Sequence, residues 1–473
     1  MASFVNQGHD LNIRVMSRRL VSASDSSIKE HVLGVSNIDL LHGAFPVSLV
    51  CIYPRPPAGG FHFHAVVAAF ESGLPSLLNH YFVHAGRIVA NPRTGLPEIL
   101  CNNQGAELIV GVADVALAGL DFSSRDLSVR KIPLPYGGDV PLSVQLVSFA
   151  CGGFSVAWGH NHLLGDGHAL LGLVCADPKK RKLGPKTVDC VNLGYAMNSV
   201  GYRFLVVKFE VPDIKVGTIM KSEDATFYGD IFPMKDVQSI SRQDMASHDG
   251  DGRRATRVQA VSAYMWKTLA AVVGAADTHC RMGWWVDGRR RLTAPEHRAL
   301  ATTSYVGNAS IFVLGEDGVE EIQRKPLPEV ASMVRELIDA PGYGDRFQEV
   351  VDWVEQHKSG ATYMDASNIG LGCPTVAVTA MTSFPMDTDL GFGHAAMAMT
   401  TTRGRGLCSG FVQMAATPRG DGAWIVSASV WPKLAAALES DELRIFVPIT
   451  AKHLGLKLNE AIVKENGSPR SRF

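Results

Sequence analysis

The stretch Trp158-Gly159-His160-Asn161-His162-Leu163-Leu164-Gly165-Asp166-Gly167-His168 is the part of the sequence around which the rest is organised. It continues an apolar, alternating run, and we predict a strand from Phe154 to His162 that places His160 and His162 on one face with Phe154. Gly165 and Gly167 then interrupt the strand and let the backbone turn around Asp166. A histidine at the end of a buried strand with a carboxylate nearby is a candidate general base, although such a histidine is more often a packed or a surface residue.

Length and composition favour a globular protein of mixed structure. The chain has 473 residues, of which 46% are hydrophobic and 19% charged, and its formal net charge is -1. This length exceeds one ordinary core, so we expect two domains or one elaborate one. The balanced charge gives no reason to expect a nucleic acid or an anionic membrane as partner, and no apolar run has the length of a bilayer span.

The cysteines and the N-terminal residues predict a cytoplasmic protein. The eight cysteines are scattered without a CxxC pair. We therefore expect buried thiols in a reducing compartment rather than a disulfide framework or a zinc site. The first ten residues lack a basic segment followed by an apolar core, so we expect no secretory signal.

Hydrophobic periodicity predicts strands with interspersed helices, and hence a mixed α/β fold. Alternating apolar residues predict strands at 11–15, 47–53, 86–89, 98–101, 142–151, 284–292, 410–414 and 424–430. Three- and four-residue spacing predicts helices at 66–81, 260–273, 329–338 and 434–445. Because Leu327 lies between two prolines, we expect it to precede the third of these helices.

A second stretch with unusual spacing lies near the end of the chain, at Thr382-Ser383-Phe384-Pro385-Met386-Asp387-Thr388-Asp389-Leu390-Gly391-Phe392-Gly393-His394. Two glycines flank Phe392 and follow an acid. They predict a tight backbone turn that holds Phe392 in place, while an ordinary surface turn has the same spacing.

Both stretches resemble motifs of one family, the plant BAHD acyl-CoA-dependent acyltransferases. His162-Leu163-Leu164-Gly165-Asp166-Gly167 matches the HxxxDG motif, and Asp389-Leu390-Gly391-Phe392-Gly393 is similar to the DFGWG motif with two aromatic positions altered. HxxxD alone is common by chance, whereas both motifs in this order are much more specific. Gly152-Gly153, Asp287-Gly288-Arg289 and Gly307-Asn308 are also similar to family positions, so the resemblance covers residues 10–174 and 250–460.

The resemblance implies two chloramphenicol-acetyltransferase-like domains, at 1–175 and 249–473, with a channel between them. Acyl-CoA would enter from one side as co-substrate, and the alcohol or amine of a small plant metabolite from the other. The family implies a cytoplasmic monomer of plant secondary metabolism, with no bound cofactor and no metal. The acyl group and the acceptor are not indicated, because family members differ in these choices.

The resemblance also assigns roles to individual residues. Neutral His162 would take the proton of the acceptor, which is worth roughly 10²–10⁴-fold in rate. Asp166 would be structural, turned away from the reaction and paired with Arg289 or otherwise with Arg291.

The remaining assignments concern the substrates. Thr382 would help to stabilise the tetrahedral oxyanion, and Ser383 and Phe384 would line the pocket, where the family often has tryptophan at the position of Phe384. Thr256 would lie near the bound CoA. The loop with Asp389, Gly391 and Gly393 would maintain the fold and the shape of the CoA side.

Residues 176–248 do not resemble this family. Segments such as Asp189-Cys190-Val191-Asn192-Leu193-Gly194-Tyr195 resemble plant copia-type retrotransposon polyproteins, between the integrase core and the reverse transcriptase. Our hypothesis is that an element fragment, or a gene-model join across one, replaces the crossover between the domains. The basic run at 178–182 resembles a nuclear localisation signal, which we interpret as a solvated remnant of the element.

Three functions remain open at this point. The first is an active acyltransferase that uses His162, and the second is a catalytically silent acyltransferase-like protein disrupted by the inserted segment. The third is a metallohydrolase that uses His160, His162, Asp166 and His168. Their HxHxxxDxH spacing departs from the HxHxDH pattern of metallo-β-lactamase-like enzymes, and the sequence contains no second ligand cluster.

Overall fold

The computed structural model describes residues 11–56, 62–123, 128–174, 189–195, 202–208, 219–222, 254–297, 305–358, 372–384, 390–402, 410–419, 422–440 and 445–456. Contacts divide the chain into two compact units. One unit combines Met1–Ala176 with Gln238–Phe473, and the other is Asp177–Val237.

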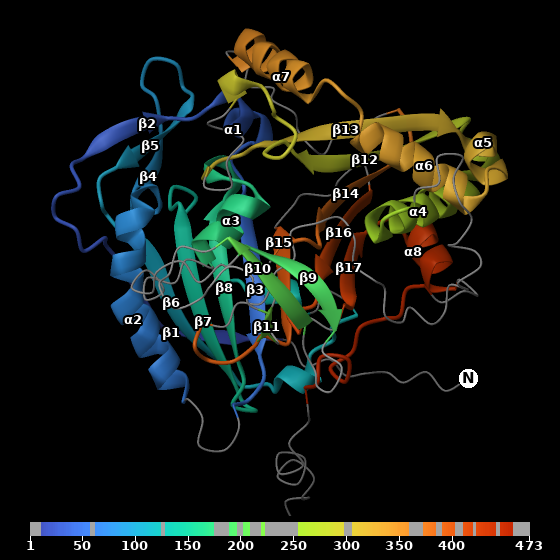
Figure 1. The fold of residues 1–473 in the computed structure, drawn as a ribbon. Helices are drawn as coiled ribbons and strands as arrows, with labels where there is room; N and C mark the ends of the chain where they lie inside the picture. Colours follow the sequence, from blue (N-terminus) through green and yellow to red (C-terminus); the bar gives the residue numbers. More distant parts are fainter. Residues whose placement is uncertain are drawn as a thin grey trace, which may run out of the picture. The chain divides into compact units, whose positions relative to one another are not determined.

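The first large sheet is built mainly from the N-terminal part of the chain (Figure 1). Its strand order is β1 (Ile13–Val21), β6 (Ala106–Ala113), β7 (Leu142–Phe149), β8 (Phe154–Asn161), β3 (Pro46–Tyr53) and β15 (Met397–Thr402). β6 and β7 run parallel, and the other neighbours are antiparallel. β8 lies between two strands and is buried along its whole length, as its apolar sequence requires.

Helices and the apolar face of this sheet form its core. α2 (Phe63–His80) contributes apolar side chains at helical spacing, from Val66 to Leu78, despite Pro75 in its interior. α3 (Gly167–Val174) adds Leu170 and Leu173 to the same core. A small sheet of β2 (His31–Gly34), β5 (Pro97–Cys101) and β4 (Arg87–Ala90) flanks this core, and α1 (Asn37–His42) precedes β3.

The second large sheet comes from the C-terminal part of the chain. Its strand order is β13 (Ser310–Gly318), β12 (His279–Asp287), β14 (Thr375–Met381), β16 (Gly410–Ala416) and β17 (Trp424–Ser429). The helices that follow and flank it are α4 (Arg257–Val273), α5 (Val319–Arg324), α6 (Leu327–Ile338), α7 (Tyr343–His357) and α8 (Pro432–Glu439). Trp266 of α4 is fully buried in the core of this sheet.

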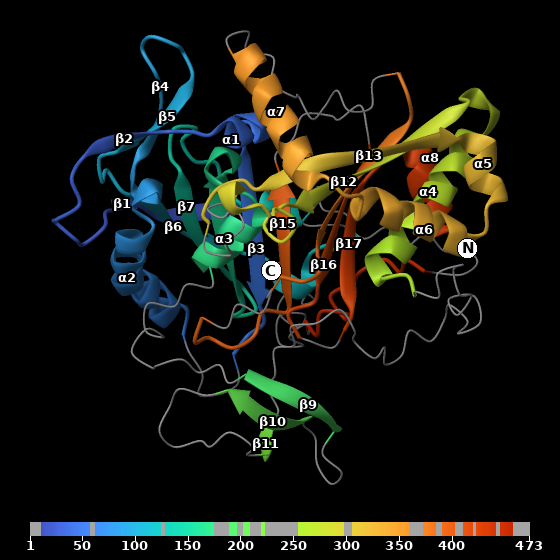
Figure 2. The same ribbon diagram turned by 45° about the horizontal axis from the view of Figure 1, so that its top comes forward.

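One strand from the C-terminal half of the sequence belongs to the first sheet. β15 belongs to the C-terminal half of the sequence, yet it pairs with β3 of the N-terminal half, from Met397 opposite Ile52 to Thr402 opposite Val47. Figure 2 shows β15 beside β3. Gln413 of β16 donates a hydrogen bond to the Thr400 hydroxyl at 2.9 Å, so β15 also contacts the second sheet.

The unit Asp177–Val237 contains a sheet of its own. Its described strands are β9 (Asp189–Tyr195), β10 (Tyr202–Lys208) and β11 (Ile219–Ser222), with β10 in the middle and antiparallel to both neighbours.

Most predicted elements are present, with different ends. The strands predicted at 86–89 and 98–101 correspond to β4 and β5, which pair antiparallel. The strand predicted at 284–292 is wrong at its end: β12 stops at Asp287, because the backbone N–H groups of Arg291 and Leu292 turn back to the Gly288 carbonyl. α6 includes Leu327, since a proline is tolerated in the first turn of a helix. α8 ends at Glu439, where Ser440 caps it, earlier than the predicted 445.

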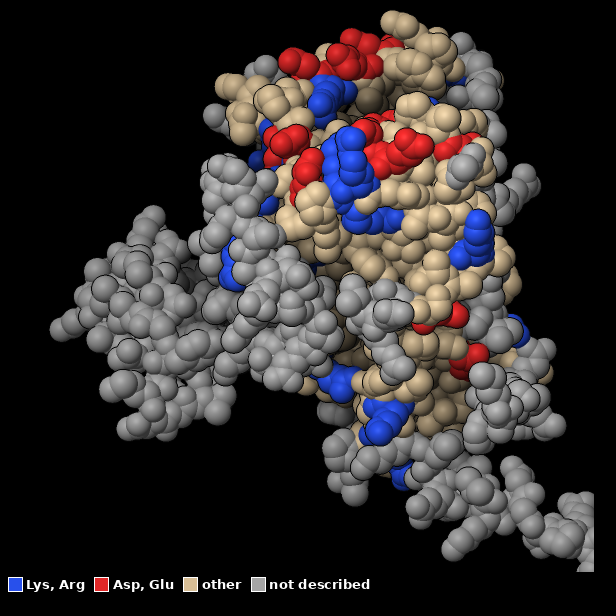
Figure 3. All heavy atoms as spheres, turned by 90° about the vertical axis from the view of Figure 1, so that its right-hand side faces the viewer, with Lys and Arg blue, Asp and Glu red and all other residues tan. Residues whose placement is uncertain are grey.

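The surface around α5 and β13 carries charges of both signs. Figure 3 shows basic and acidic side chains interspersed on the face that includes α5. Arg281 of β12 pairs with Glu316 of β13, and Lys325, which follows α5, pairs with Asp317 of β13. Among the helices that the structure describes, none combines the length and the hydropathy that a membrane span requires.

Candidate active site

His162 leaves strand β8 at the point where a short 3-10 turn, His162–Leu164, begins. The Asn161 side chain accepts a hydrogen bond from the Leu163 N–H at 3.0 Å and so caps this turn. The prediction that the strand continues through His162 is therefore wrong by one residue. The two histidines have different ring neighbours: His162 lies against His42 and Phe45, and His160 lies against His84.

The shared face of β8 is otherwise as predicted. Phe154 contacts Phe63 of α2, and Trp158 contacts Phe70 of the same helix. His160 lies on this side as well, with its ring centroid 5.5 Å from that of His84. His160 Nε2 is 3.0 Å from the Gly165 carbonyl oxygen. His160 is therefore a packed histidine that holds the turn after His162.

Asp166 is held by a bidentate ion pair with Arg289. The two Arg289–Asp166 hydrogen bonds measure 2.8 and 3.2 Å, and the side chains are 1% and 8% exposed. The Asp166 carboxylate also accepts from the backbone N–H groups of Ala309, His168 and Ala169 at 3.0, 3.1 and 3.1 Å. Burial by itself raises the pKa of Asp166, but the charge of Arg289 and these hydrogen bonds hold it below its ordinary value.

Arg289 is thus the arginine that the structure places against Asp166, and Arg291 lies elsewhere. Arg289 also donates to the carbonyl oxygen of Gly307 at 2.8 Å and to the carboxylate of Asp287 at 3.1 Å. Arg291 instead faces Asp339 at 3.4 Å, where both side chains are partly exposed. With its oxygens occupied by these donors, Asp166 does not contact the His162 ring as an acid–base partner.

Asn308 connects the region of the ion pair to the backbone of His162. Its side-chain amide donates to the His162 carbonyl oxygen at 2.9 Å and to Asp39 at 2.9 Å, and its backbone N–H donates to Asp39 at 3.0 Å. Asp39 in turn forms a capping box with Ser36 at the start of α1. The Ser36-x-x-Asp39 spacing is visible in the sequence as a helix start, but its link to His162 is not.

Two aromatic rings lie against the imidazole of His162. The Phe45 ring has its centroid at 4.9 Å and an interplanar angle of 26°, and the His42 ring lies at 5.0 Å and 15°. The Phe45 carbonyl also accepts the His162 N–H at 2.9 Å. Neither residue belongs to a motif that the sequence suggested.

Crowding keeps His162 neutral. Burial, followed by the neighbouring His42 and His160, lowers the pKa of His162 to about 3. Asp166 and the carbonyl group of His162 raise this pKa without offsetting the burial. At neutral pH the ring is therefore unprotonated and able to accept a proton, which is the state that a general base requires.

The residues required by the metallohydrolase alternative do not form a cluster that could bind a metal ion. His160 faces His84 and the Gly165 carbonyl, His162 stacks on His42, and Asp166 is occupied by Arg289. His168 lies against Phe384, with ring centroids 5.7 Å apart. Within the described ranges, no three histidine, cysteine or acidic side chains form a group that could hold a metal ion.

The predicted pocket residues lie in the turn after β14. Phe384 is half-buried and contacts His168 of the HxxxDG segment, so the structure brings it next to the motif. Thr382 is half-buried and Ser383 is exposed. No hydrogen bond links either residue to His162 in the described part of the chain.

The second motif packs at the other end of β8. Gly391 and Gly393 have φ of 88° and 89°, a left-handed conformation that glycine adopts without strain. Between them Phe392 contacts Phe154 edge-to-face, with centroids 6.3 Å apart. Asp389 lies outside the described residues.

Thr256 has a structural contact of its own. It is the N-cap of α4, where its hydroxyl accepts the Gln259 N–H and the Gln259 side chain accepts the Thr256 N–H. Its predicted position near CoA stays a prediction.

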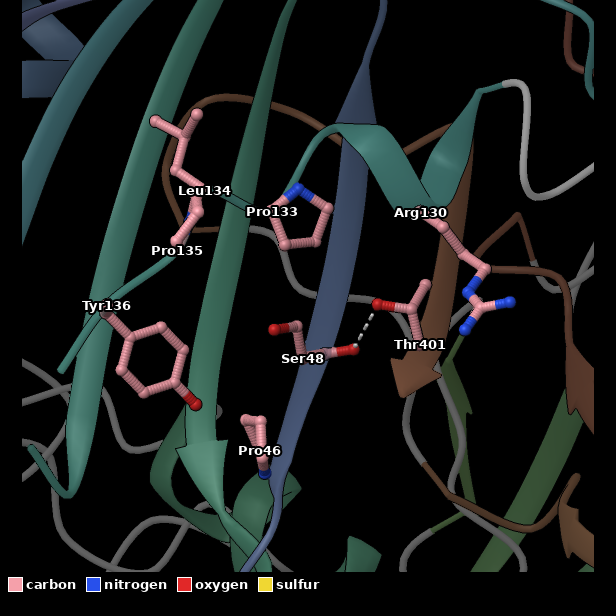
Figure 4. A pocket seen from close by; sticks show the side chains of 8 residues that line it. All are labelled: Pro46, Ser48, Arg130, Pro133, Leu134, Pro135, Tyr136 and Thr401. Atoms are coloured by element: carbon pink, nitrogen blue, oxygen red, sulfur yellow. Dashed lines mark hydrogen bonds between the residues drawn. The ribbon is translucent and has the colours of Figure 1, made fainter. Parts of the chain in front are cut away.

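A small pocket of about 80 Å³ lies against β3 and β15, between Ser48, Thr401 and the segment from Arg130 to Tyr136 (Figure 4). It begins at Pro46, the residue after Phe45. The Tyr136 hydroxyl donates to the His160 carbonyl at 3.2 Å, and the Thr401 hydroxyl donates to the Ser48 carbonyl at 3.5 Å. The pocket is lined by Pro46, Ser48, Arg130, Pro133, Leu134, Pro135, Tyr136 and Thr401.

Comparison with known proteins gives a family and a fold. A model of the Transferase family matches residues 11–429. The chain is 24% identical to a putrescine hydroxycinnamoyltransferase of Oryza sativa subsp. japonica, over 81% of this chain and 89% of that protein. It is also 24% identical to the acyltransferase GLAUCE of Arabidopsis thaliana, over 74% and 80% of the two chains.

Solved structures share the two-domain architecture. Vinorine synthase matches with a TM-score of 0.64 and 17% identity, over 93% of this chain and 100% of that chain. TRI101 of F. graminearum, in complex with coenzyme A and T-2 mycotoxin, matches with a TM-score of 0.59 and 14% identity, over 87% and 98%. The mixed α/β fold of two chloramphenicol-acetyltransferase-like domains is thereby confirmed.

We predict that Asp166→Asn strongly destabilises the protein. The substitution keeps the shape of the side chain but removes the buried carboxylate, so that Arg289 keeps only the partly exposed Asp287 as a charged partner, at a cost of about 3 kcal/mol in the free energy of unfolding. Urea denaturation followed by circular dichroism measures this. Arg281→Gln, which removes the partner of Glu316 on the surface, is the matched control and should cost about 1 kcal/mol or less. Equal losses in the two variants would contradict the prediction.

We also predict that the protein becomes less stable as the pH falls below about 6.5. An unfolded histidine protonates near that pH, whereas burial lowers the pKa of His84 and of His162 to about 3 in the folded protein. Between these values the unfolded chain binds more protons, so stability falls by about 1.4 kcal/mol per histidine and pH unit. The urea midpoint at pH 7.5, 6 and 5 measures the slope. His84→Leu should make it shallower, and a midpoint independent of pH argues against buried neutral histidines.

Proposed function

The chain belongs to the Transferase family, the BAHD acyl-CoA-dependent acyltransferases, and from this premise we propose that it transfers an acyl group from acyl-CoA to a hydroxyl or amine of a small plant metabolite, with His162 as general base. One observation carries the assignment: His162 is a neutral imidazole at the end of β8, and Asp166 of the same motif is held by Arg289 and by backbone N–H groups. The histidine therefore acts alone on the proton.

The reaction follows from these positions. The neutral imidazole of His162 removes the proton of the acceptor as its oxygen or nitrogen attacks the thioester carbonyl. A tetrahedral oxyanion forms, and we assign its stabilisation to Thr382 in the turn after β14. When the intermediate collapses, the C–S bond breaks, the CoA thiolate leaves and the proton on His162 passes to it.

Ser383, Phe384 and the pocket of Figure 4 are proposed to contact the substrates. Phe384 lies against His168, next to the motif turn, and the pocket begins one residue from Phe45, which stacks on His162. At about 80 Å³ the pocket is too small for a whole ligand and is suited to one end of a substrate. We assign Thr256 and the Gly391–Gly393 loop to the CoA side, as the family resemblance implies.

The names of several relatives suggest substrates for a first assay. They include a putrescine hydroxycinnamoyltransferase of rice, a spermidine coumaroyl-CoA acyltransferase of Arabidopsis thaliana and a hydroxycinnamoyltransferase of Narcissus pseudonarcissus. We therefore propose hydroxycinnamoyl-CoA as donor and a diamine or polyamine as acceptor. We further propose a monomer in a reducing, cytosolic compartment, in line with free thiols at Cys101, Cys151, Cys280 and Cys373.

We predict acceptor-dependent release of CoA that depends on His162. Purified protein is offered hydroxycinnamoyl-, benzoyl-, malonyl- and acetyl-CoA with mixed amines and alcohols, and His162→Ala should lower kcat by roughly 10²–10⁴-fold. His279→Ala, an exposed histidine on β12, is the control and should keep full activity. Turnover that survives His162→Ala excludes the general-base role. A folded wild-type protein without turnover for any pair supports the catalytically silent alternative.

The pH profile of the same assay separates the two acceptor classes. Since the pKa of His162 is lowered to about 3, the rate with an alcohol should stay level from about pH 8 to pH 5. With an alkylamine the rate should rise with pH, because only the free amine attacks and its conjugate acid has a pKa of about 10.4.

Residues 176–248 are proposed to derive from a copia-type retrotransposon. The sequence resemblance supports this origin, and it is compatible with a separate compact unit at Asp177–Val237 whose described strands pair only with one another. We predict that the transcript, read across codons 174 and 250, contains the element-like segment. A continuous family-like message at this place would show that the segment is a gene-model join.

A further inference from the structure

We propose that His42 is a positioning residue for His162, which fixes the plane of the catalytic imidazole by stacking on it while it is itself anchored to Ser310. This inference rests on the proposed role of His162 as general base. His42 ends helix α1, far from the HxxxDG segment in the sequence, and the structure alone brings the two rings together.

The first step is the geometry of the stack. The His42 and His162 rings are 15° from parallel with centroids 5.0 Å apart, and Phe45 lies 26° from parallel with His162 at 4.9 Å. Two nearly parallel rings thus pack against the imidazole. Rotation of the imidazole out of its plane would bring it into collision with these neighbours.

The second step is the anchor of His42. Its Nε2 lies 2.9 Å from the Ser310 carbonyl oxygen and 3.3 Å from the Ser310 hydroxyl, and the residue is 9% exposed. A carbonyl oxygen can only accept, so neutral His42 carries its proton on Nε2 and donates it to Ser310. Ser310 begins β13, two residues after Asn308, which holds the His162 carbonyl.

The third step is the support behind His42. Trp285 of β12 lies on it with centroids 4.7 Å apart at 38°, and Phe312 of β13 lies on Trp285 at 5.2 Å. His42 therefore cannot move away from His162 without displacing side chains of the second sheet. The row of rings from Phe45 to Phe312 passes from the N-terminal half of the sequence to the C-terminal half.

The consequence concerns which nitrogen meets the substrate. His162 Nδ1 is buried without a hydrogen-bond partner among the described residues, whereas the ring as a whole is half-buried. Nε2 is thus the nitrogen left to face a bound acceptor. A stacked, immobile ring keeps this nitrogen on one line of approach, and a displacement of about 1 Å can cost 10²-fold in rate.

The charged and titratable groups that face His42 set its own state. Burial lowers the pKa of His42, while the Ser310 carbonyl, Asp166 and Asp39 raise it without offsetting the burial. His42 is therefore neutral at pH 7. A protonated His42 repels a protonated His162, and this repulsion lowers the pKa of His162.

We predict that His42→Leu, which fills the space without a ring or a donor, lowers kcat by roughly 10–100-fold and leaves KM within about threefold. His42→Phe keeps the stack but loses the anchor to Ser310, so its kcat should lie between those of His42→Leu and the wild type. The acidic limb of the kcat profile should move to higher pH in His42→Leu, because the repulsion on protonated His162 is gone.

The matched control is His84→Leu, which removes another buried histidine; the His84 ring contacts His160 and has no ring contact with His162 in the described structure. It should cost similar stability and leave kcat and the acidic limb in place. Wild-type kcat and pH profile in His42→Leu would overturn the proposal. Should His42→Leu fail to fold, wild-type kcat in His42→Phe would overturn the role of the Ser310 anchor.

A second readout is independent of turnover. In the NMR spectrum of histidine-labelled protein, the His162 Cε1 proton, assigned from the spectrum of His162→Ala, should be shifted upfield by the Phe45 and His42 rings. The shift should decrease in His42→Leu, and an unchanged shift contradicts the stack. If no donor and acceptor pair is turned over, the proposed function fails, but the shift still tests the contact between His42 and His162.

Discussion

The buried ion pair between Asp166 and Arg289 is the interaction on which the site depends. Taking two charges out of water costs several kcal/mol for each, and the cost is offset by the attraction between the close charges together with further hydrogen bonds. Asp166 accepts from Arg289 and from backbone N–H groups of two separate segments, and Arg289 also donates to the Gly307 carbonyl. The turn after β8 must therefore lie against the segment that enters β13.

The position of His162 follows from this requirement. Asn308 stands between Gly307, which accepts from Arg289, and Ala309, which donates to Asp166. Its amide is thereby brought under the His162 carbonyl, and through Asp39 it holds helix α1, whose last residue is His42. The acid of the motif thus acts on the geometry of the histidine rather than on its proton.

The same arrangement places the site where the two sheets meet. β8 and its turn belong to the first sheet, Arg289 and Asn308 flank strands of the second, and β15 passes from one half of the chain to pair with β3 of the other. The reaction that we propose joins two substrates at this junction of the two sheets.

The sequence alone determined the local features that depend on spacing. Alternation predicted β8 and its buried face, helical periodicity predicted α2 and α4, and the two motifs predicted the family. The sequence also left Arg289 and Arg291 as two possible partners of Asp166, and it extended the strand through His162. Neither the choice of arginine nor the last residue of a strand is encoded in periodicity, because both depend on contacts with distant segments.

Only the tertiary structure decided which side chains surround His162. His42, Phe45 and Asn308 are an ordinary helix end, loop residue and turn residue when read along the chain. They become parts of the site because three contacts bring separate segments together. These are the Asp166–Arg289 pair, the capping of α1 by Ser36 and Asp39, and the pairing of β15 with β3. Spacing along a chain specifies which side chains share a face of one strand or helix. Contacts between distant segments are decided only in the folded protein, where every buried charge needs a partner and every apolar face must be covered.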